Sequence, residues 1–404
     1  MRASSRSNEY ASVAVLALGF GLVGIDRFLI STMFPTMARD LHLGYGDIGK
    51  IAGALAIAWG VAALFMGNIA DRIGRRKVLV GSLVVFSLLI GMSGLAVGLL
   101  SLIAVRIVMG LADGAYTPAS ISATIHCSPP EHRGRNIGFQ QMTLTLFGLG
   151  LSPLIVAALL HVFPWRFIFS IFVIPGLLLA WFTRRIIPAQ AVDDAAGSRG
   201  GGNDWLRVLG YRNIRLLMPS MLCWLTCLIT TSAFIPSYLL DHLHLSEMQM
   251  GSIMSAIGFG STAGTLFLPW LSDRIGRKSV MMLSSLGTAI SLLLLNALGP
   301  DVPLLFAALF MVHFFNNSAI TLTVGPICSE TVPAALMATA SGTVIAVGEL
   351  LGGGLAPIMA GQFAEKFGLS YLLWLPIGAV FAGFLLSLFL KETLPSAVKS
   401  PSAR

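Results

Sequence analysis

Charged side chains are scarce in this chain: Asp, Glu, Lys and Arg make up 11% of its 404 residues, whereas hydrophobic residues make up 55%. A soluble globular domain devotes about a quarter of its residues to charge, so the scarcity excludes an ordinary soluble protein. Apolar stretches of about 18 residues or more recur between short charged breaks, and each can cross the hydrocarbon layer as a helix. The sequence therefore predicts a helical integral membrane protein.

Several kinds of functional motif are also missing. The four cysteines have no metal-ligand spacing and no disulfide pattern. No Walker-type nucleotide loop and no nucleophile–base pair is visible, so we expect no cofactor, no metal and no enzymatic activity. The first apolar stretch is too long for a cleavable signal peptide and lacks a small-residue cleavage site, so it should remain as the first span.

The excess of positive charge has a strongly uneven distribution. If Asp71 and Asp273 lie on the cytoplasmic side, 20 of the 26 Lys and Arg residues fall in cytoplasmic segments and only four in outer ones. This asymmetry is the positive-inside rule and not a nucleic-acid footprint. It predicts a multi-pass protein of the inner or plasma membrane with both termini in the cytoplasm.

The sequence contains an internal repeat. The charged break at 67–78 (GNIADRIGRRKV) returns at 269–280 (PWLSDRIGRKSV), and the displacement from Asp71 to Asp273 is 202 residues, half of the chain. The stretch GLGLSP at 148–153 is echoed by GGGLAP at 352–357. Two structurally similar halves are expected.

The duplicated break resembles the signature loop of the major facilitator superfamily, where it joins the second and third helices. The resemblance implies an all-α fold of twelve transmembrane helices in two pseudo-symmetric six-helix bundles. We expect the bundles at 1–185 and 213–404, joined by a cytoplasmic linker at 186–212 that is polar and glycine-rich. The spans are predicted near 11–36, 47–68, 78–98, 101–125, 137–160, 165–184, 214–240, 248–270, 279–299, 303–327, 336–362 and 370–390.

The resemblance also assigns a gating role to the signature loop. It implies that Asp71 interacts with Arg75 and with the start of span eleven, so that the two halves are locked on the cytoplasmic side. The residues expected to take part in conformational gating are Gly67, Asp71, Arg72, Gly74, Arg75, Asp273 and Arg277.

Five ionisable residues fall inside predicted spans, where a charge is expensive unless it faces protein or water. They are Asp26, Arg27, Arg106, Asp113 and Glu349. Arg106 and Asp113 lie on one stripe of span four, whereas Asp26 and Arg27 point about 100° apart. A structural network that ties spans one and four together is one reading. The other is an anion receptor, because a guanidinium presents a bidentate fork to a carboxylate.

The context of these charges resembles the anion:cation symporter family within the superfamily. The residues that carry the likeness are IDRF at 25–28 with Ser31 and Pro35, and Arg106, Gly110, Asp113, Gly114 and Pro118 in span four. The family implies that Asp26 and Asp113 are proton sites and that Arg27 and Arg106 hold the substrate. Two departures are Asp113, where the family usually has Glu, and Phe28-Leu29, where it usually continues with a polar Asn.

Candidates in the second half are fewer. His313, Asn316 and Asn317 form a polar patch on span ten, and His313 and Asn317 are predicted to bind substrate if the patch faces the cavity; helix-to-helix hydrogen bonding is the alternative. Glu349 is either a third proton site or a side chain held near the span-eleven backbone.

We therefore expect a monomeric transporter that takes up a small organic carboxylate together with protons. A substrate carboxylate that competes for an arginine would release the acid paired with it, and the released acid would take a proton, so the two ligands would bind with positive coupling. The rival prediction is a proton-coupled exporter of drugs or lipids.

Overall fold

The computed structural model describes residues 2–129, 132–188, 204–333 and 336–394; for residues 2–8, 64–72, 204 and 338 it describes the backbone but not the side chains. The described chain is helical, and twelve of its helices are long and apolar enough to cross a membrane. The predicted fold class is confirmed.

The first half of the chain is formed by α1 (Arg2–Leu41), α2 (Tyr45–Ile73), α3 (Arg75–Ser93), α4 (Leu99–Cys127), α5 (Arg133–Thr145), the π-helical segment η2 (Leu146–Leu151), α6 (Ser152–Leu160), α7 (Trp165–Ile171) and α8 (Val173–Ile186). The second half is formed by α9 (Asp204–Leu209), α10 (Arg212–Ser237), the π-helical η3 (Tyr238–His242), α11 (Glu247–Ile275), α12 (Arg277–Ala297), α13 (Val302–Val324), α14 (Pro326–Thr331), α15 (Met337–Val347), the π-helical η5 (Gly348–Leu355), α16 (Ala356–Phe367), the short η6 (Leu369–Tyr371) and α17 (Trp374–Leu388).

The repeat extends to the backbone conformation. The break between α2 and α3 falls at Gly74 and the break between α11 and α12 at Gly276, with φ of 95° and 102°. Positive φ is easily reached by glycine, so each signature loop turns without a Cβ clash. His42 and His244, also 202 residues apart, share a left-handed conformation with φ of 52° and 53°. The two halves therefore use the same turns at the same places.

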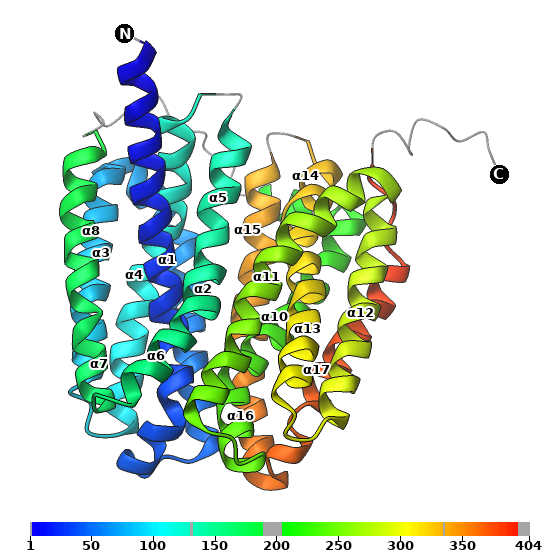
Figure 1. Cartoon of the computed structure of the whole chain (residues 1–404). Helices are drawn as coiled ribbons and strands as arrows, with labels where there is room; N and C mark the ends of the chain where they lie inside the picture. Colours follow the sequence, from blue (N-terminus) through cyan, green and yellow to red (C-terminus); the bar gives the residue numbers. More distant parts are fainter. Residues whose placement is uncertain (1, 130–131, 189–203, 334–335, 395–404) are drawn as a thin grey trace.

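Figure 1 shows α1, α3, α4 and α8 on one side of the molecule and α12, α13 and α17 on the other, with both termini at the same end. The halves meet where glycines allow close approach. A Cβ on Gly53 of α2 would overlap Gly354 of η5, and a Cβ on Gly258 of α11 would overlap Gly150 of η2. Arg39 and Tyr45 add polar contacts to Asp241 near the His42 and His244 turns, each at 3.2 Å. These contacts hold the halves together in the middle and at the end opposite the termini.

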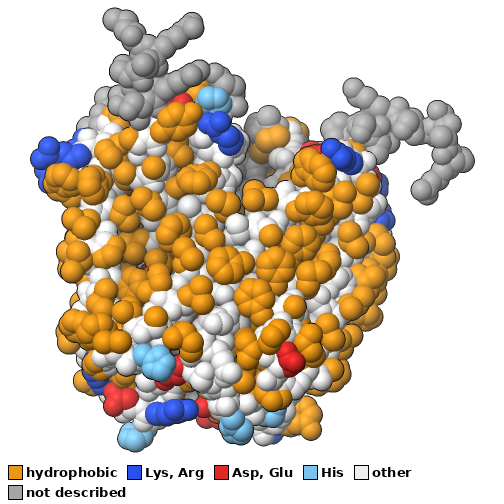
Figure 2. Space-filling view, in the orientation of Figure 1, with side chains coloured by type: hydrophobic (Ala, Val, Ile, Leu, Met, Phe, Trp, Pro, Cys, Tyr) orange, Lys and Arg blue, Asp and Glu red, His pale blue; other side chains and the backbone are white. Residues whose placement is uncertain are grey.

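The surface is that of a membrane-embedded bundle. In Figure 2 hydrophobic side chains cover the middle of the molecule, whereas Lys, Arg, Asp, Glu and His gather at its two ends. The same view shows a hollow between the two halves at the end that carries the termini.

Candidate functional site

Arg106 connects span four to span one. Its Nη1 donates a 2.8 Å hydrogen bond to the backbone oxygen of Asp26 and lies 4.0 Å from the Asp26 carboxylate. The Nε and Nη2 atoms are buried and have no hydrogen-bond partner. These two nitrogens form one edge of the planar guanidinium, so Arg106 keeps an unused pair of donors of the kind that binds a carboxylate through two parallel bonds.

Asp113 lies beside Asp26 at the same buried place. Asp113 is fully buried and Asp26 is 1% exposed. Both oxygens of Asp113 and Oδ2 of Asp26 receive no hydrogen bond from a protein donor. The two carboxyl groups are nevertheless within hydrogen-bonding reach of each other. Two ionised carboxylates only accept, so this contact becomes a hydrogen bond when one of the pair carries a proton.

Arg27 and Glu349 form an ion pair between the two halves. Nη1 of Arg27 donates to Oε1 at 3.2 Å and Nη2 donates to Oε2 at 2.7 Å, and the side chains are 9% and 10% exposed. The guanidinium also lies 4.5 Å from the centre of the Trp59 ring, a cation–π arrangement. The Glu349 carboxylate is bonded to Arg27, and its Oε2 also lies close to Gly353 of the span-eleven backbone. A proton-site role for Glu349 stays a prediction. Asp26 and Arg27 take different partners, as their directions on span one predicted.

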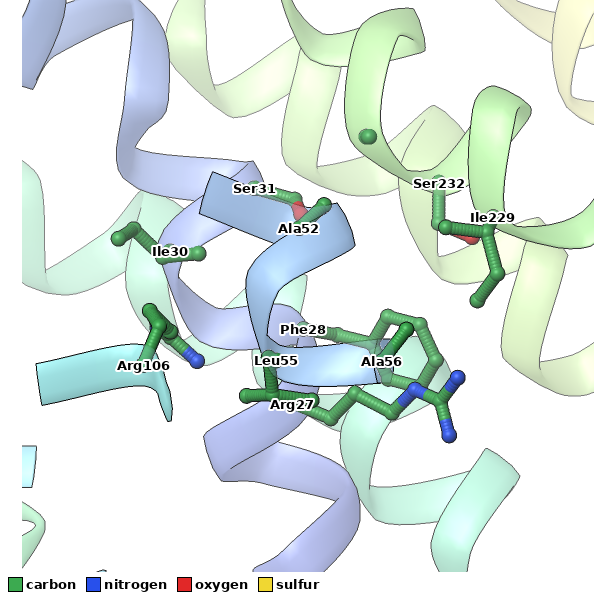
Figure 3. Close-up of a pocket in the computed structure, with 11 residues that line it drawn as sticks. Arg27, Phe28, Ile30, Ser31, Ala52, Leu55, Ala56, Arg106, Ile229 and Ser232 are labelled. Atoms are coloured by element: carbon green, nitrogen blue, oxygen red, sulfur yellow. The ribbon is translucent and has the colours of Figure 1, made fainter. Parts of the chain in front are cut away.

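The two arginines line one pocket between α1, α2, α4 and α10 (Figure 3). The space that remains open in it is small, with a cavity volume of about 20 Å³. This volume holds little more than a water molecule, so a larger ligand requires the helices to move apart. The lining residues are Arg27, Phe28, Ile30, Ser31, Ala52, Leu55, Ala56, Arg106, Ile229, Ser232 and Ala233.

The polar patch of span ten binds neighbouring helices. His313 Nε2 lies 3.1 Å from Thr231 Oγ1 of α10, and Asn317 Nδ2 donates to Thr265 Oγ1 of α11 at 2.8 Å. Asn316 Nδ2 donates to the backbone oxygen of Trp224 at 3.1 Å. None of the three is among the residues that line the pocket. The arrangement is the helix-to-helix bonding that was the alternative for this patch.

The signature loops are described unequally. The side chains of Asp71 and Arg72 lie outside the described part of the chain, as does the surrounding of Gly67, so the predicted contact of Asp71 stays a prediction. Arg75 begins α3 and makes polar interactions. In the second copy Arg277 contacts Asp273 at 2.5 Å and Glu330 of α14 at 2.9 Å.

Two partners of this cluster were missed from the sequence. Glu330 lies at the end of span ten, and Glu392 accepts hydrogen bonds from the backbone nitrogens of Arg277 and Lys278 at 2.9 and 3.1 Å. No local signal links either acid to Arg277, because Glu330 lies 53 and Glu392 lies 115 residues away in the sequence. In the structure Glu392 lies at the N-terminus of α12, which attracts negative charge. Trp59 was missed as well, and nothing in its local sequence distinguishes it from a lipid-facing aromatic.

Comparison with known proteins places the chain among transporters. The family profile described as Major Facilitator Superfamily matches residues 16–246 and 220–404. The chain is 25% identical to the sialic acid transporter NanX of Escherichia coli over 89% of this chain and 88% of that one. It is 26% identical to the 3-(3-hydroxy-phenyl)propionate transporter of Escherichia coli over 89% and 88% of the two chains.

The fold also matches a solved structure. A bacterial homologue of the human lysosomal transporter Spinster, in an inward-facing and unoccupied conformation, superposes with a TM-score of 0.76. The match covers 98% of this chain and 99% of that one at 17% sequence identity. At this identity it is evidence for the fold alone.

Proposed function

The chain belongs to the Major Facilitator Superfamily, and from this premise we propose that it is a proton-coupled symporter that takes up a small organic carboxylate. The bundles of residues 1–185 and 213–404 rock about the pocket in an alternating-access cycle. Twelve spans and the transporter family make it a multi-pass membrane protein. The charge asymmetry supports an inner-membrane location with both termini cytoplasmic.

One observation carries the proposal: two arginines, of which Arg106 is buried and Arg27 is largely covered, line a single pocket at the junction of the halves. Cations buried among helices are retained where an anion or an internal acid balances them. The relatives named above carry sialic acid and 3-(3-hydroxy-phenyl)propionate, which are both organic acids. Their names support an organic acid as the substrate here.

Charge balance in the pocket supplies the coupling. Arg27 and Glu349 neutralise each other, and Arg106 faces the two acids Asp26 and Asp113. When one of these acids is protonated, the cluster carries no net charge. An arriving carboxylate adds one negative charge, which a second proton on Asp26, Asp113 or Glu349 offsets. Because an uncompensated charge in this environment costs several kcal/mol, substrate and proton bind together.

The signature loops serve as cytoplasmic gates in this cycle. The ion pairs of Arg277 with Asp273 and Glu330 tie α11, α12 and α14 together at the end that carries the C-terminus. We propose that Gly67, Asp71, Arg72, Gly74 and Arg75 play the matching role in the first half, since the two loops share their sequence pattern and their turn.

Purified protein in liposomes provides the test. An inward proton gradient should drive accumulation of a radiolabelled organic acid, and an ionophore that collapses the gradient should abolish it. Net efflux driven by the same gradient, with a neutral or cationic compound as the cargo, would contradict symport and favour the drug or lipid exporter. Equal uptake with and without the proton gradient would contradict proton coupling.

A further inference from the structure

We propose that the substrate is a monocarboxylate with an apolar, aromatic or aliphatic body, and that its carboxylate is held by the Nε–Nη2 edge of Arg106. This inference rests on the proposed function, because it specifies which organic acid the same pocket accepts. It distinguishes the chain from a carrier of polyhydroxylated sugar acids.

The unused donors of the site are on Arg106. Both terminal nitrogens of Arg27 already hold Glu349, whereas Arg106 uses only Nη1 for Asp26. The Nε and Nη2 atoms of Arg106 are buried without partners, and the residue lines the pocket. A carboxylate bound there would gain two charge-assisted hydrogen bonds without breaking an existing pair. One available fork accommodates one carboxylate, which favours a monocarboxylate over a dicarboxylate.

The rest of the pocket offers little for hydroxyl groups. Apart from the arginines, its side chains with polar atoms are Ser31 and Ser232, and the Ser232 hydroxyl already donates to the backbone oxygen of Leu228. The remaining lining side chains are apolar: Phe28, Ile30, Ala52, Leu55, Ala56, Ile229 and Ala233. A hydroxylated body placed against them would lose its water without gaining partners. A ring or an alkyl chain would instead gain from the same burial.

A binding panel on the purified full-length protein tests the proposal directly. The probes are 3-phenylpropionate, D-gluconate, succinate and the neutral 3-phenylpropanamide. Thermal unfolding measures the shift in melting temperature that each probe causes, and calorimetry measures its dissociation constant. We expect 3-phenylpropionate to stabilise the folded protein and to bind at least tenfold more tightly than each of the other three. Tighter binding of gluconate or succinate would overturn the apolar monocarboxylate, and equal binding of the amide would overturn the role of Arg106.

The panel also separates this inference from the proposed function. If gluconate or succinate binds and 3-phenylpropionate does not, the substrate class is wrong while organic-acid transport stands. If no carboxylate binds and a neutral or cationic amphiphile does, both fail together.

Two variants test where the carboxylate of the ligand binds and where its apolar body binds. Arg106→Lys keeps the charge but not the planar two-donor edge, so the dissociation constant of 3-phenylpropionate should rise at least tenfold. Ile229→Thr removes apolar contact in the pocket, so 3-phenylpropionate should bind about tenfold more weakly. The affinity for D-gluconate should stay the same or rise slightly. The matched control is Ile290→Thr on the outer surface of α12, which is 58% exposed and should leave binding unchanged. Equal effects of the two Thr variants would contradict an apolar subsite at Ile229 and with it the proposal.

Discussion

The first half of the molecule holds buried charges at positions where the second half holds uncharged residues. Helices α4 and α13 begin 203 residues apart, and with this displacement Asp113 has its counterpart in Asn316 and Arg106 in Leu309. Asp113 receives no hydrogen bond from a donor, whereas Asn316 donates to the backbone of α10. Two copies of one unit have thus diverged into a half with unsatisfied charge and a half with neutral helix-to-helix bonding.

The difference indicates a division of labour. Unpaired polar groups are buried in both halves, but among the described residues the charged ones, on Asp26, Arg106 and Asp113, all lie in the first half. A buried charge without a partner costs more than a neutral group does, so its retention indicates a function there. The second half contributes Glu349 from η5, and this acid reaches across to Arg27 of the first half. We infer that the charges for carboxylate binding and proton coupling lie mainly in the first half, and that the second half contributes Glu349 and the apolar wall of the pocket at Ile229.

Removing the first half's central cation should have the largest effect. In Arg106→Ala, Asp26 loses its cation and the pocket loses its free fork, so we expect binding of the organic acid to fall at least 100-fold and the stability to fall by about 3–5 kcal/mol. Calorimetry and thermal unfolding measure the two quantities. The matched control is Arg39→Ala, whose side chain is 70% exposed and which should cost no more than about 1 kcal/mol. Comparable losses in the two variants would refute the special place of Arg106.

Making the first half resemble the second should abolish coupling but not binding. Asp113→Asn reproduces the neutral residue of the repeat, so counterflow should persist while accumulation driven by a proton gradient falls to background. Liposome assays of the two modes separate these outcomes. Continued accumulation would move the proton site to Asp26 or Glu349. The reverse change, Asn316→Asp, should lower the melting temperature and add no transport, because the counterpart of Arg106 on the same helix is the apolar Leu309.

Breaking the ion pair between the halves should have an intermediate effect. Glu349→Gln removes the charge opposite Arg27, so the halves should separate more easily at the end that bears the His42 turn. A cysteine at Ser232 should then react several-fold faster with an impermeant thiol reagent added from that side. Asp241→Asn, which weakens the more exposed pair with Arg39, should raise the rate less. An unchanged labelling rate in Glu349→Gln would show that the pair does not hold the halves together.

Truncating the neutral network of the second half should have the smallest effect on function. Asn317→Ala removes a hydrogen bond between α13 and α11 and should cost about 1 kcal/mol of stability. The affinity for the substrate should stay within about twofold of the original. A tenfold loss of affinity at preserved stability would return Asn317 to the substrate-binding residues and weaken the comparison of the halves.

Sequence reasoning was strongest where a single span carries the information. The twelve spans follow from apolar length, and the stripe of Arg106 and Asp113 follows from helical geometry. Partners across spans were harder to predict. Nothing local links Arg27 to Glu349, 322 residues away, or His313 to Thr231, because such pairs depend on how separate helices are placed. The helical spacing that put His313 and Asn317 on one face did not reveal that the face meets other helices.

The π-helical segments have a consequence for every future alignment of this chain. Segments η2 and η5 begin 202 residues apart and interrupt spans five and eleven. A π-helical turn inserts residues that a 3.6-residue period does not count, and each inserted residue shifts the angular phase of everything after it by about 100°. A helical wheel drawn through span eleven from Met337 therefore assigns the wrong orientation to α16, and the count must restart at Ala356. The same phase correction applies at Ser152 in span five. In a relative that lacks the inserted residue, an aligned position after this point lies on a different face of the helix.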